Sequence, residues 1–420
     1  MLAGLAAQSM DEHERSTDIS MEELRALVET AGGETVAMIM QNRATPEPRS
    51  FIGEGKVQEM KELIAMNDCN LAVFDNELSP SQMRVLSEDL GVKVLDRSGL
   101  ILDIFAQRAQ TREGQLQVEL AQYHYLMPRL TGMWTHLVRQ TASGGGSPIG
   151  TRGPGETQLE TDRRHIRKKI QKLEEELEAV RKVRATQRRQ REKNAVPVVA
   201  LVGYTNAGKS SILNALTDAG IPANNRLFDT LDTTTRHLKL EATEEILLSD
   251  TVGFIRKLPH HLVEAFKATL EELKYADVLL HVIDISNPDW ESQAKIVDDL
   301  ITELGAQETP CIRVFNKCDA YMGVLPHGEN TVCISARTGE GLDRLKKAIS
   351  DILNADKYHA IFRIPYSRGD IVSLLQAEAA VLQLEYAEDG TVMEAIVKPE
   401  IWGRVKQFSN IPERQKEAWE

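Results

Sequence analysis

The sequence has no apolar run long enough to cross a membrane. Its longest apolar stretches, Val196–Val202 and Val278–Ile285, are far shorter than the roughly 18 to 20 residues that a bilayer requires. The apolar run Leu2–Ala7 has no basic leader and is followed at once by acidic residues, which is unlike a secretory signal. We therefore expect a cytoplasmic protein without a transmembrane helix.

Cysteine is scarce, and its spacing excludes two kinds of site. The four cysteines are scattered in apolar contexts, and no two form a CxxC pair. They are Cys69, Cys311, Cys318 and Cys333. This pattern supports neither a disulfide framework nor a zinc site, so we expect reduced thiols that fill the core. A long-period internal repeat is also missing.

The length and composition are those of a folded chain with more than one domain. The 420 residues are 42% hydrophobic and 27% charged, which is ordinary globular usage. A single core stops growing well below this length, so we expect two or three domains.

The charge is distributed unevenly. Fifty basic and sixty-three acidic residues give a net charge of −13, which argues against a nucleic-acid partner. However, residues 163–193 contain thirteen Lys or Arg and five Glu, a net of +8, which leaves −21 for the rest. This segment is either a solvated helix or a basic rod that holds a polyanion.

The pattern of elements predicts a multidomain α/β protein. Helical and strand-like segments alternate from residue 20 to 105, regular α/β alternation resumes at Ala195, and strands and helices mix again after Tyr358. We expect four parts: an N-terminal α/β domain (1–105), a long antiparallel helical hairpin (106–194), a doubly wound P-loop domain or G domain (195–355), and a small C-terminal α+β domain (356–420).

Two matching apolar seams predict the hairpin. Residues spaced alternately by four and three are Leu116, Leu120, Tyr123, Met127 and Leu130 in the first helix, and Ile166, Ile170, Leu173, Leu177 and Val180 in the second. Each seam would cover the other. Between them, the Gly- and Pro-rich stretch Ser143–Glu156 predicts a loop (142–156) at the tip.

Within the G domain we expect strands at 196–202, 246–250, 278–285, 311–316 and 331–335, with helices at 210–217, 261–275, 290–304 and 341–353. For the C-terminal part we expect strands at 360–364, 383–386 and 392–397 and helices at 370–382 and 400–408. Asp389-Gly390 is a hairpin-turn signal.

A phosphate-binding loop follows the first G-domain strand. It comprises Gly203, Tyr204, Thr205, Asn206, Ala207, Gly208, Lys209 and Ser210. The glycines allow backbone N–H groups to surround a β-phosphate, Lys209 reaches the β- and γ-phosphate oxygens, and the Ser210 hydroxyl ligates Mg²⁺. A ligand-free glycine turn is the weaker interpretation.

A second phosphate-sensing element follows the next apolar strand. Here Asp250, Thr251, Val252 and Gly253 form an Asp-x-x-Gly sequence. Asp250 can hold Mg²⁺ through water, and the Gly253 N–H can bond the γ-phosphate. We therefore place Lys209 and Gly253 among the catalytic residues.

Two short segments at later strand ends predict guanine as the base. They are Asn316, Lys317, Cys318 and Asp319, and then Ser335, Ala336 and Arg337. The Asp319 carboxylate can accept two hydrogen bonds from guanine, whereas adenine offers no such donor pair. The backbone N–H near Ser335-Ala336 is placed for guanine O6. We expect binding of GTP and GDP with Mg²⁺.

The segment between the two phosphate elements supplies the remaining candidates. Several threonines compete to complete the Mg²⁺ coordination. The nucleotide-contacting candidates are Phe228, Asp229, Thr230, Leu231 and Asp232.

These motifs and their order resemble a translation-factor-class GTPase, and the whole assembly resembles the HflX family. The resemblance spans about Thr35 to Asn354 and is carried by Asp75–Gln82, Gly150–Arg164, Thr230–Arg236 and Asp250–Arg256. It implies that Thr230 is the third metal ligand, beside Ser210 and Asp250, and a catalytic residue. The family usually has alanine and proline where this chain has Asp229 and Thr233.

Phe254 stands where many GTPases have a water-positioning glutamine. Phenylalanine cannot orient water, so we expect slow hydrolysis by the protein alone. Phe254 can equally be a hydrophobic plug.

The resemblance further implies a monomeric GTPase that binds the large ribosomal subunit and dissociates stalled or stressed ribosomes. Residues expected to contact ribosomal RNA are Arg152, Arg163, Arg164, Arg167 and Lys168. Two other interpretations stay open: a GTP-dependent RNA-modification or chaperone enzyme, and a regulatory switch that docks protein partners through its hairpin without a ribosomal role.

Overall fold

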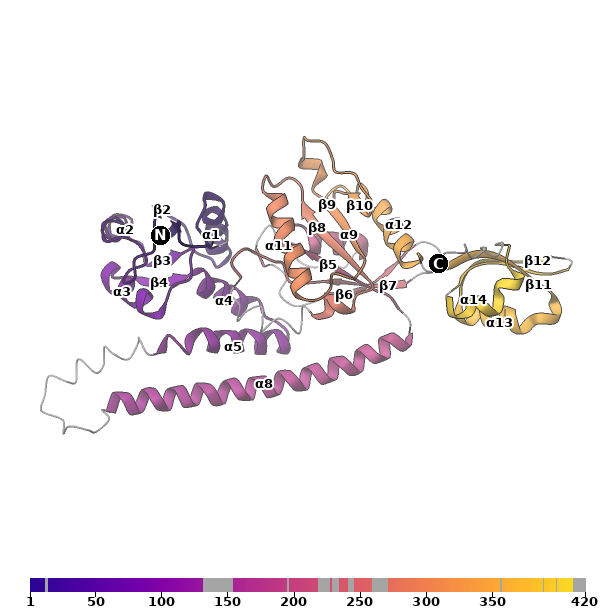
Figure 1. The fold of residues 1–420 in the computed structure, drawn as a ribbon, viewed down its shortest axis with the longest axis horizontal. Helices are drawn as coiled ribbons and strands as arrows, with labels where there is room; N and C mark the ends of the chain where they lie inside the picture. The colour runs from indigo at the N-terminus through magenta and orange to yellow at the C-terminus, as the bar shows by residue number, and fades with distance from the viewer. Residues whose placement is uncertain are drawn as a thin grey trace, which may run out of the picture.

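The computed structural model confirms the multidomain α/β architecture (Figure 1). The structure describes residues 1–11, 14–130, 154–194, 196–217, 227–228, 234–240, 245–258, 271–355, 357–387, 389–397 and 399–410. Three separate sheets follow one another along the chain, and a two-helix arm runs beneath the first two. Within these residues, no helix is both long and apolar enough to cross a membrane.

The N-terminal sheet is parallel, with strand order β2-β1-β3-β4. Its strands are β1 (Leu2–Ala7), β2 (Met38–Arg43), β3 (Leu71–Phe74) and β4 (Lys93–Asp96). The helices of this part are α1 (Asp18–Thr30), α2 (Glu54–Met66), α3 (Pro80–Leu90) and α4 (Arg97–Arg108). The order reverses at β1, because β2 lies on one side of it and β3 on the other, so the sheet is doubly wound.

Strand β1 and helix α4 were not predicted from the sequence. Both are apolar on more than one side. Strand β1 is buried between two neighbours, so it lacks the polar alternation that marks a half-exposed strand. In α4, consecutive residues from Leu100 to Leu102 are all buried, which hides a helical period.

The helical arm consists of α5 (Arg112–Leu126) and α8 (Pro154–Asn194). Their seam buries Leu116 and Leu120 against Ile170, Leu173 and Leu177, as the heptad spacing predicts. Arg112 pairs with Glu176 (2.6 Å). Glu119, seven residues later in α5, pairs with Lys169 (3.3 Å), seven residues earlier in α8. The hairpin is therefore antiparallel.

The tip loop predicted at 142–156 extends too far at its C-terminal end. Helix α8 begins at Pro154, so residues 154–156 are helical rather than loop. Proline is tolerated in the first turn because its missing N–H would have no intrahelical partner there. The remainder of the expected loop, 142–153, lies outside the described residues.

The G-domain sheet has the strand order β10-β9-β8-β5-β7-β6. The strands are β5 (Val198–Gly203), β6 (Thr234–Lys239), β7 (Glu245–Asp250), β8 (Val278–Asp284), β9 (Cys311–Asn316) and β10 (Thr331–Cys333). Helices α9 (Lys209–Thr217), α11 (Trp290–Glu303) and α12 (Leu342–Leu353) accompany them, with short 3-10 turns η1 (Glu271–Tyr275) and η2 (Cys318–Ala320). All strands are parallel except β6.

Strand β6 was missed because it is a polar edge strand in which only Leu238 is buried. The expected helix 261–275 lies mostly outside the described residues, and its described end is the 3-10 turn η1 rather than an α-helix.

The C-terminal sheet is antiparallel, with order β11-β13-β12. Its elements are β11 (Tyr358–Ile364), η3 (Tyr366–Arg368), α13 (Gly369–Glu378), β12 (Ala380–Ala387), β13 (Gly390–Val397), α14 (Pro399–Val405) and η4 (Lys406–Phe408). The helix expected to reach Leu382 ends at Glu378. Ala379 is extended, and β12 then pairs with β13 through an irregularity between Val381 and Gln383.

Candidate nucleotide-binding site

The phosphate loop joins the central strand β5 to α9. Lys209 is the first residue of α9, and its Nζ donates to the carbonyl oxygens of Gly203 (3.1 Å) and Tyr204 (2.8 Å). The side chain is almost fully buried. Burial lowers the Lys209 pKa to about 8, while the nearby Asp250 carboxylate opposes this shift. A buried cation at the start of a helix is suited to hold phosphate oxygens.

Two glycines of the loop are required by their neighbours. A Cβ at Gly203 would lie 2.3 Å from the Val282 carbonyl oxygen, and one at Gly208 would lie 2.2 Å from Asn316 Nδ2. Gly208 also has φ +96°, in the left-handed region. The glycines thus allow the loop to pack directly on β8 and on Asn316.

Oxygen ligands of the kind that Mg²⁺ prefers lie together at the carboxyl end of the sheet. The Ser210 hydroxyl donates to Asp250 Oδ2 (2.6 Å), and Asp250 is fully buried at the end of β7. A hydroxyl and a carboxylate side by side fit the donor set of this cation. Thr230, together with Asp229, Leu231 and Asp232, lies outside the described residues.

The Asp-x-x-Gly loop pairs with the phosphate loop. The Thr205 N–H donates to the Phe254 carbonyl (2.7 Å), and the Phe254 N–H donates to the Gly203 carbonyl (3.2 Å). A Cβ at Gly253 would lie 3.0 Å from Lys209 Nζ and 3.0 Å from the Thr205 Cα. The two loops are therefore in close contact.

Phe254 is buried in an apolar cluster that includes residues of the N-terminal domain. In the same cluster, Phe228 packs edge-to-face on Phe105 of α4, with ring centroids 4.6 Å apart. A side chain buried in this way is a hydrophobic plug and is turned away from solvent.

The candidate base-binding residues converge at the ends of β9 and β10. Asn316 Nδ2 donates to the Ala207 carbonyl (2.9 Å), and its Oδ1 accepts from the Ala336 N–H (3.0 Å). Asn316 thereby ties the phosphate loop to the segment Ser335–Arg337.

The Asp319 carboxylate is held by Ser335 and Arg337. The Ser335 hydroxyl donates to Asp319 Oδ1 (2.6 Å), and the Arg337 guanidinium lies 2.5 Å from Oδ2. The Ser335 hydrogen bond and then the Arg337 charge lower the Asp319 pKa, so the group is ionised, as acceptance from guanine requires.

Lys317 and Cys318 contact protein groups beside this site. Lys317, with φ +64°, pairs with Asp284 (2.7 Å) at the end of β8, a residue that sequence reasoning did not single out. The Cys318 thiol donates to the Phe315 carbonyl (3.2 Å), and burial raises its pKa to about 11.

Charged residues of the N-terminal domain contact the phosphate and Asp-x-x-Gly loops, and sequence reasoning assigned none of them a role at this site. Glu23 accepts from the Tyr204 hydroxyl, and Asp75 pairs with Lys257. Buried Arg97 pairs with both Glu23 and Asp75. Only the Asp-Asn pair that follows an apolar strand at residue 75 could have signalled them.

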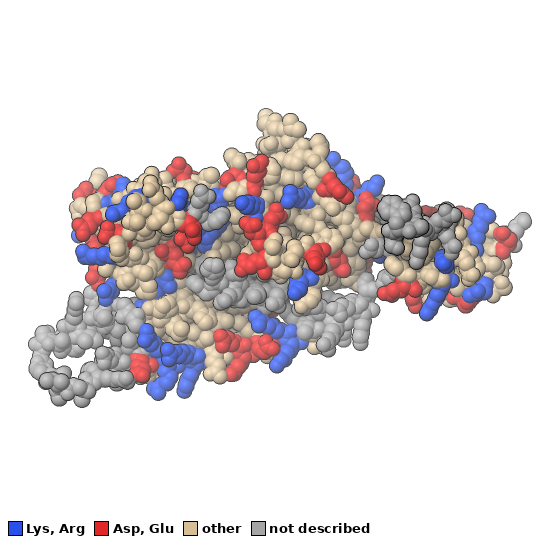
Figure 2. Space-filling view, in the orientation of Figure 1, with Lys and Arg blue, Asp and Glu red and all other residues tan. Residues whose placement is uncertain are grey.

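Four of the five candidate RNA-binding residues lie on α8. Arg164, Arg167 and Lys168 are exposed, and Arg163 is half-buried, whereas Arg152 lies outside the described residues. Figure 2 shows basic side chains in groups along α8, with acidic side chains between them.

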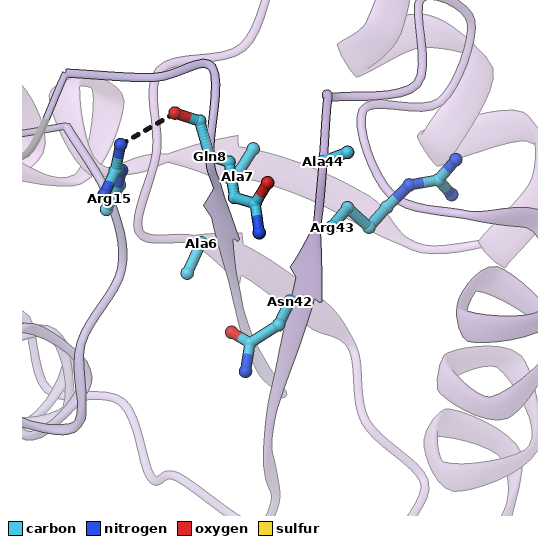
Figure 3. A pocket seen from close by; sticks show the side chains of 7 residues that line it. All are labelled: Ala6, Ala7, Gln8, Arg15, Asn42, Arg43 and Ala44. Carbon is cyan, nitrogen blue, oxygen red and sulfur yellow. Dashed lines mark hydrogen bonds between the residues drawn. The ribbon is translucent and has the colours of Figure 1, made fainter.

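Away from the nucleotide site, a cavity of about 500 Å³ opens beside the carboxyl ends of β1 and β2 (Figure 3). Its two guanidinium groups already have partners. Arg15 donates to the Gln8 carbonyl (2.7 Å), and Arg43 pairs with Glu47 (3.1 Å). We assign this cavity no role.

Comparison with known families matches most of the chain. Residues 18–106 match the family described as GTP-binding GTPase N-terminal, and 108–191 match the GTP-binding GTPase middle region. Residues 198–317 match the 50S ribosome-binding GTPase family, and 324–419 match the HflX C-terminal domain.

Two individual relatives are similar to this chain over most of its length. The GTPase HflX of Caldanaerobacter subterraneus is 47% identical over 93% of this chain and 90% of its own length. The GTPase HflX of Lacrimispora saccharolytica is 49% identical over 91% and 90%. A GTP-binding protein from Sulfolobus solfataricus, solved with GDP, covers 84% of this chain and 99% of its own at 24% identity, with a TM-score of 0.44.

Proposed function

The chain belongs to the HflX family of GTPases, and on this premise we propose that it binds the large ribosomal subunit and couples its GTP cycle to the dissociation of ribosomes. The GTPase activity itself follows from the family. The ribosomal role rests on one observation above all: most of the described basic side chains of α8 are exposed, and this helix ends only a few residues before β5, the strand that carries the phosphate loop.

In the nucleotide cycle, each group has a role that its position supports. Lys209 would hold the β- and γ-phosphates, and the Gly253 N–H would contact the γ-phosphate. Ser210, Thr230 and Asp250 would hold Mg²⁺, the last through water. When bound, this ion neutralises phosphate charge. Asp319 would select guanine.

On the ribosome, α8 would act as an RNA-binding arm. A helix of 41 residues is about 60 Å long, which is enough to enter an RNA-walled cavity. Arg163, Arg164, Arg167 and Lys168 would contact phosphates, and so would Arg152 of the expected tip loop. Because the body of the chain is strongly acidic, the arm alone would approach RNA.

Hydrolysis would be slow until the ribosome binds. Phe254 is buried and has no group that can orient water, so an external partner would complete the site. GTP then serves as a switch: the protein associates, separates stalled or stressed ribosomes into subunits, and leaves after γ-phosphate loss. In this scheme the protein acts as a monomer in the cytoplasm.

The test is GTP turnover with and without purified large subunits. We expect turnover to rise by at least tenfold with large subunits and to change little with small subunits. Equal turnover in all three conditions would refute the ribosomal role, and a purely protein-docking hairpin would give that result.

A further inference from the structure

The last turn of helix α5 is held on the N-terminal domain by a buried carboxylate. Asp96, the last residue of β4, is fully buried. The Tyr125 hydroxyl donates to its Oδ1 (2.7 Å), and the Arg129 guanidinium donates to its Oδ2 (3.0 Å). Tyr125 lies in the last turn of α5, and Arg129 lies just beyond the end of this helix. We call these three residues the Asp96 anchor, which joins the arm to the end of an N-terminal strand.

The Asp96 anchor also involves other elements of the N-terminal domain. Asp96 Oδ1 accepts from the Gly99 N–H (2.8 Å) in the first turn of α4, and Oδ2 accepts from the Leu78 N–H (3.3 Å), between β3 and α3. The Arg129 guanidinium donates to the Leu78 carbonyl (3.2 Å). Groups from α4, from the segment before α3 and from the arm therefore meet at one carboxylate. Breaking a buried pair of this kind is costly, whereas exposed ion pairs contribute little.

The side chains of the anchor are closely packed. The Arg129 guanidinium lies over the Tyr125 ring, 3.6 Å from its centroid, and donates to the Tyr125 carbonyl (2.8 Å). A Cβ at Gly99 would lie 2.7 Å from the Tyr125 hydroxyl oxygen, so glycine leaves room for this hydroxyl to reach Asp96. The Arg129 side chain is only 10% exposed. Arg129 therefore serves the protein interior, unlike the exposed arginines of α8.

The anchor lies at the level of the candidate RNA-binding residues. Helix α5 lies between α8 and the N-terminal domain (Figure 1). The register of the two interhelical ion pairs, extended along α5, places Tyr125 opposite Arg163 of α8. Met127 and Ile166 pack against the same apolar seam, and the candidate RNA-binding residues of α8 flank Ile166. The anchored turn of α5 thus supports the part of α8 that carries them.

The anchor restrains the arm far from its covalent connections. Those connections, from α4 into α5 and from α8 to β5, lie at the same end of the hairpin. Tyr125 lies about 20 Å along the helix from its first residue, Arg112. Val118 and Ala121 of α5 also pack in the apolar cluster of the N-terminal domain, but apolar contacts are not directional. The hydrogen-bonded anchor is therefore the contact that keeps the arm from pivoting.

We infer that Tyr125 and Arg129 are positioning residues for the RNA-binding arm: by holding the end of α5 on Asp96, they fix the direction in which α8 presents its basic residues. This inference rests on the proposed function, because the large subunit supplies the RNA. An arm that is already ordered loses less conformational freedom when it binds. The anchor therefore raises the affinity for RNA without making a phosphate contact of its own.

The test measures the binding of full-length variants to purified large subunits at two salt concentrations. Arg129→Gln removes the guanidinium from Asp96. We expect it to weaken binding by about fivefold, the scale of an added ordering cost. The factor should be the same at both salt concentrations, because the number of phosphate contacts is unchanged. Arg129→Lys, which keeps a charge for Asp96, should recover part of the loss.

Two further variants isolate the anchor. Arg112→Gln changes an arginine of the same helix that is 68% exposed, and it should leave binding within twofold of the parent. Tyr125→Phe removes one hydroxyl and keeps the ring beneath the guanidinium, so it should weaken binding less than Arg129→Gln. If Arg129→Gln does not fold, Tyr125→Phe decides. Basal GTP turnover without subunits should be unchanged in all of these variants.

A distance measurement tests the anchor without the ribosome. Spin labels at Lys61→Cys on α2 and His165→Cys on α8 report the direction of the arm in a full-length chain whose four native cysteines are replaced by alanine. Pulsed electron paramagnetic resonance should give a narrow distance distribution for this chain and a broader one when Arg129→Gln is added. An equally narrow distribution would show that the anchor does not set the direction of the arm.

The binding results can also overturn the inference. A loss for Arg129→Gln that disappears at high salt would make Arg129 a phosphate contact rather than a positioning residue. Binding within twofold of the parent for both Arg129→Gln and Tyr125→Phe would equally refute it. If the parent binds no large subunits, the ribosomal role and the RNA part of this inference fail together. A failure of the anchor alone leaves the binding of the parent intact and is thus distinguishable.

Discussion

The two ends of the nucleotide site are built differently. At the base end, Asn316 hydrogen-bonds to the phosphate loop and to Ala336, and Ser335 hydrogen-bonds to Asp319. All of these contacts lie within the G domain. At the phosphate end, the loops contact Glu23 and Asp75, which lie some 180 residues earlier in the chain. The expected base site is thus held within one domain, whereas the loops of the expected phosphate site also contact another domain.

This difference has an energetic side. Asp319 is held by short contacts to neighbouring loops near solvent, so its site depends little on the rest of the molecule. The phosphate end contains buried charges, and a buried charge that loses its partner is costly. Substitutions at the base end should therefore affect that end alone. Substitutions at the phosphate end should also affect its contacts with the N-terminal domain.

The largest effect is expected at Lys209. Lys209→Ala should abolish GTP binding or hydrolysis, because no other described cation in the phosphate loop can replace it. Turnover and equilibrium binding measure this. Turnover equal to that of the parent would refute the phosphate-loop assignment.

The sequence predicts local motifs but not contacts between domains. The Asp-x-x-Gly and Asn-Lys-x-Asp segments could be predicted because each is short and lies at a strand end. Arg97 and Glu23 were not predicted, because a buried charge cannot be told from a surface charge in the sequence until its partner is known. Arg97 pairs with Glu23 and Asp75, and Glu23 also accepts from Tyr204. The seam of α5 and α8 was readable from its period, whereas β1 is apolar on both faces and has none.

The second largest effect concerns Asp319. Asp319→Asn should shift preference from guanine to xanthine by about a hundredfold or more, because the amide donates where the carboxylate accepted. Competition between GDP and xanthosine diphosphate measures it. Retained guanine selectivity would contradict the role of Asp319.

A smaller effect is expected on the arm, which lies outside both ends of the site. Replacing Arg163, Arg164 and Arg167 by Gln should weaken binding to large subunits by about tenfold or more at moderate salt. Nucleotide affinity should be spared.

Binding at two salt concentrations sharpens this prediction. Each lost phosphate contact should flatten the salt dependence, so parent and variant should converge at high salt. Replacing Glu174, Glu175 and Glu178 by Gln on the same helix is the matched control, and it should not weaken binding. A loss that is equal at both salt concentrations would point to docking on protein rather than RNA.

The smallest effect is a pH dependence confined to the phosphate end. Burial lowers the folded-state pKa of Lys209 to about 8, and phosphate binds the protonated amine. Nucleotide binding therefore takes up a proton above that pH, and affinity should fall by about fourfold between pH 7 and 8.5. The same shift makes the free protein gain stability as pH rises from about 8 toward the ordinary lysine value, because the unfolded chain then binds more protons. Lys209→Arg, whose guanidinium stays charged, should bind with a flatter pH profile. An equally steep profile in this variant would assign the titration to another group, and a flat profile in the parent would mean that Lys209 stays protonated in the folded protein throughout this range.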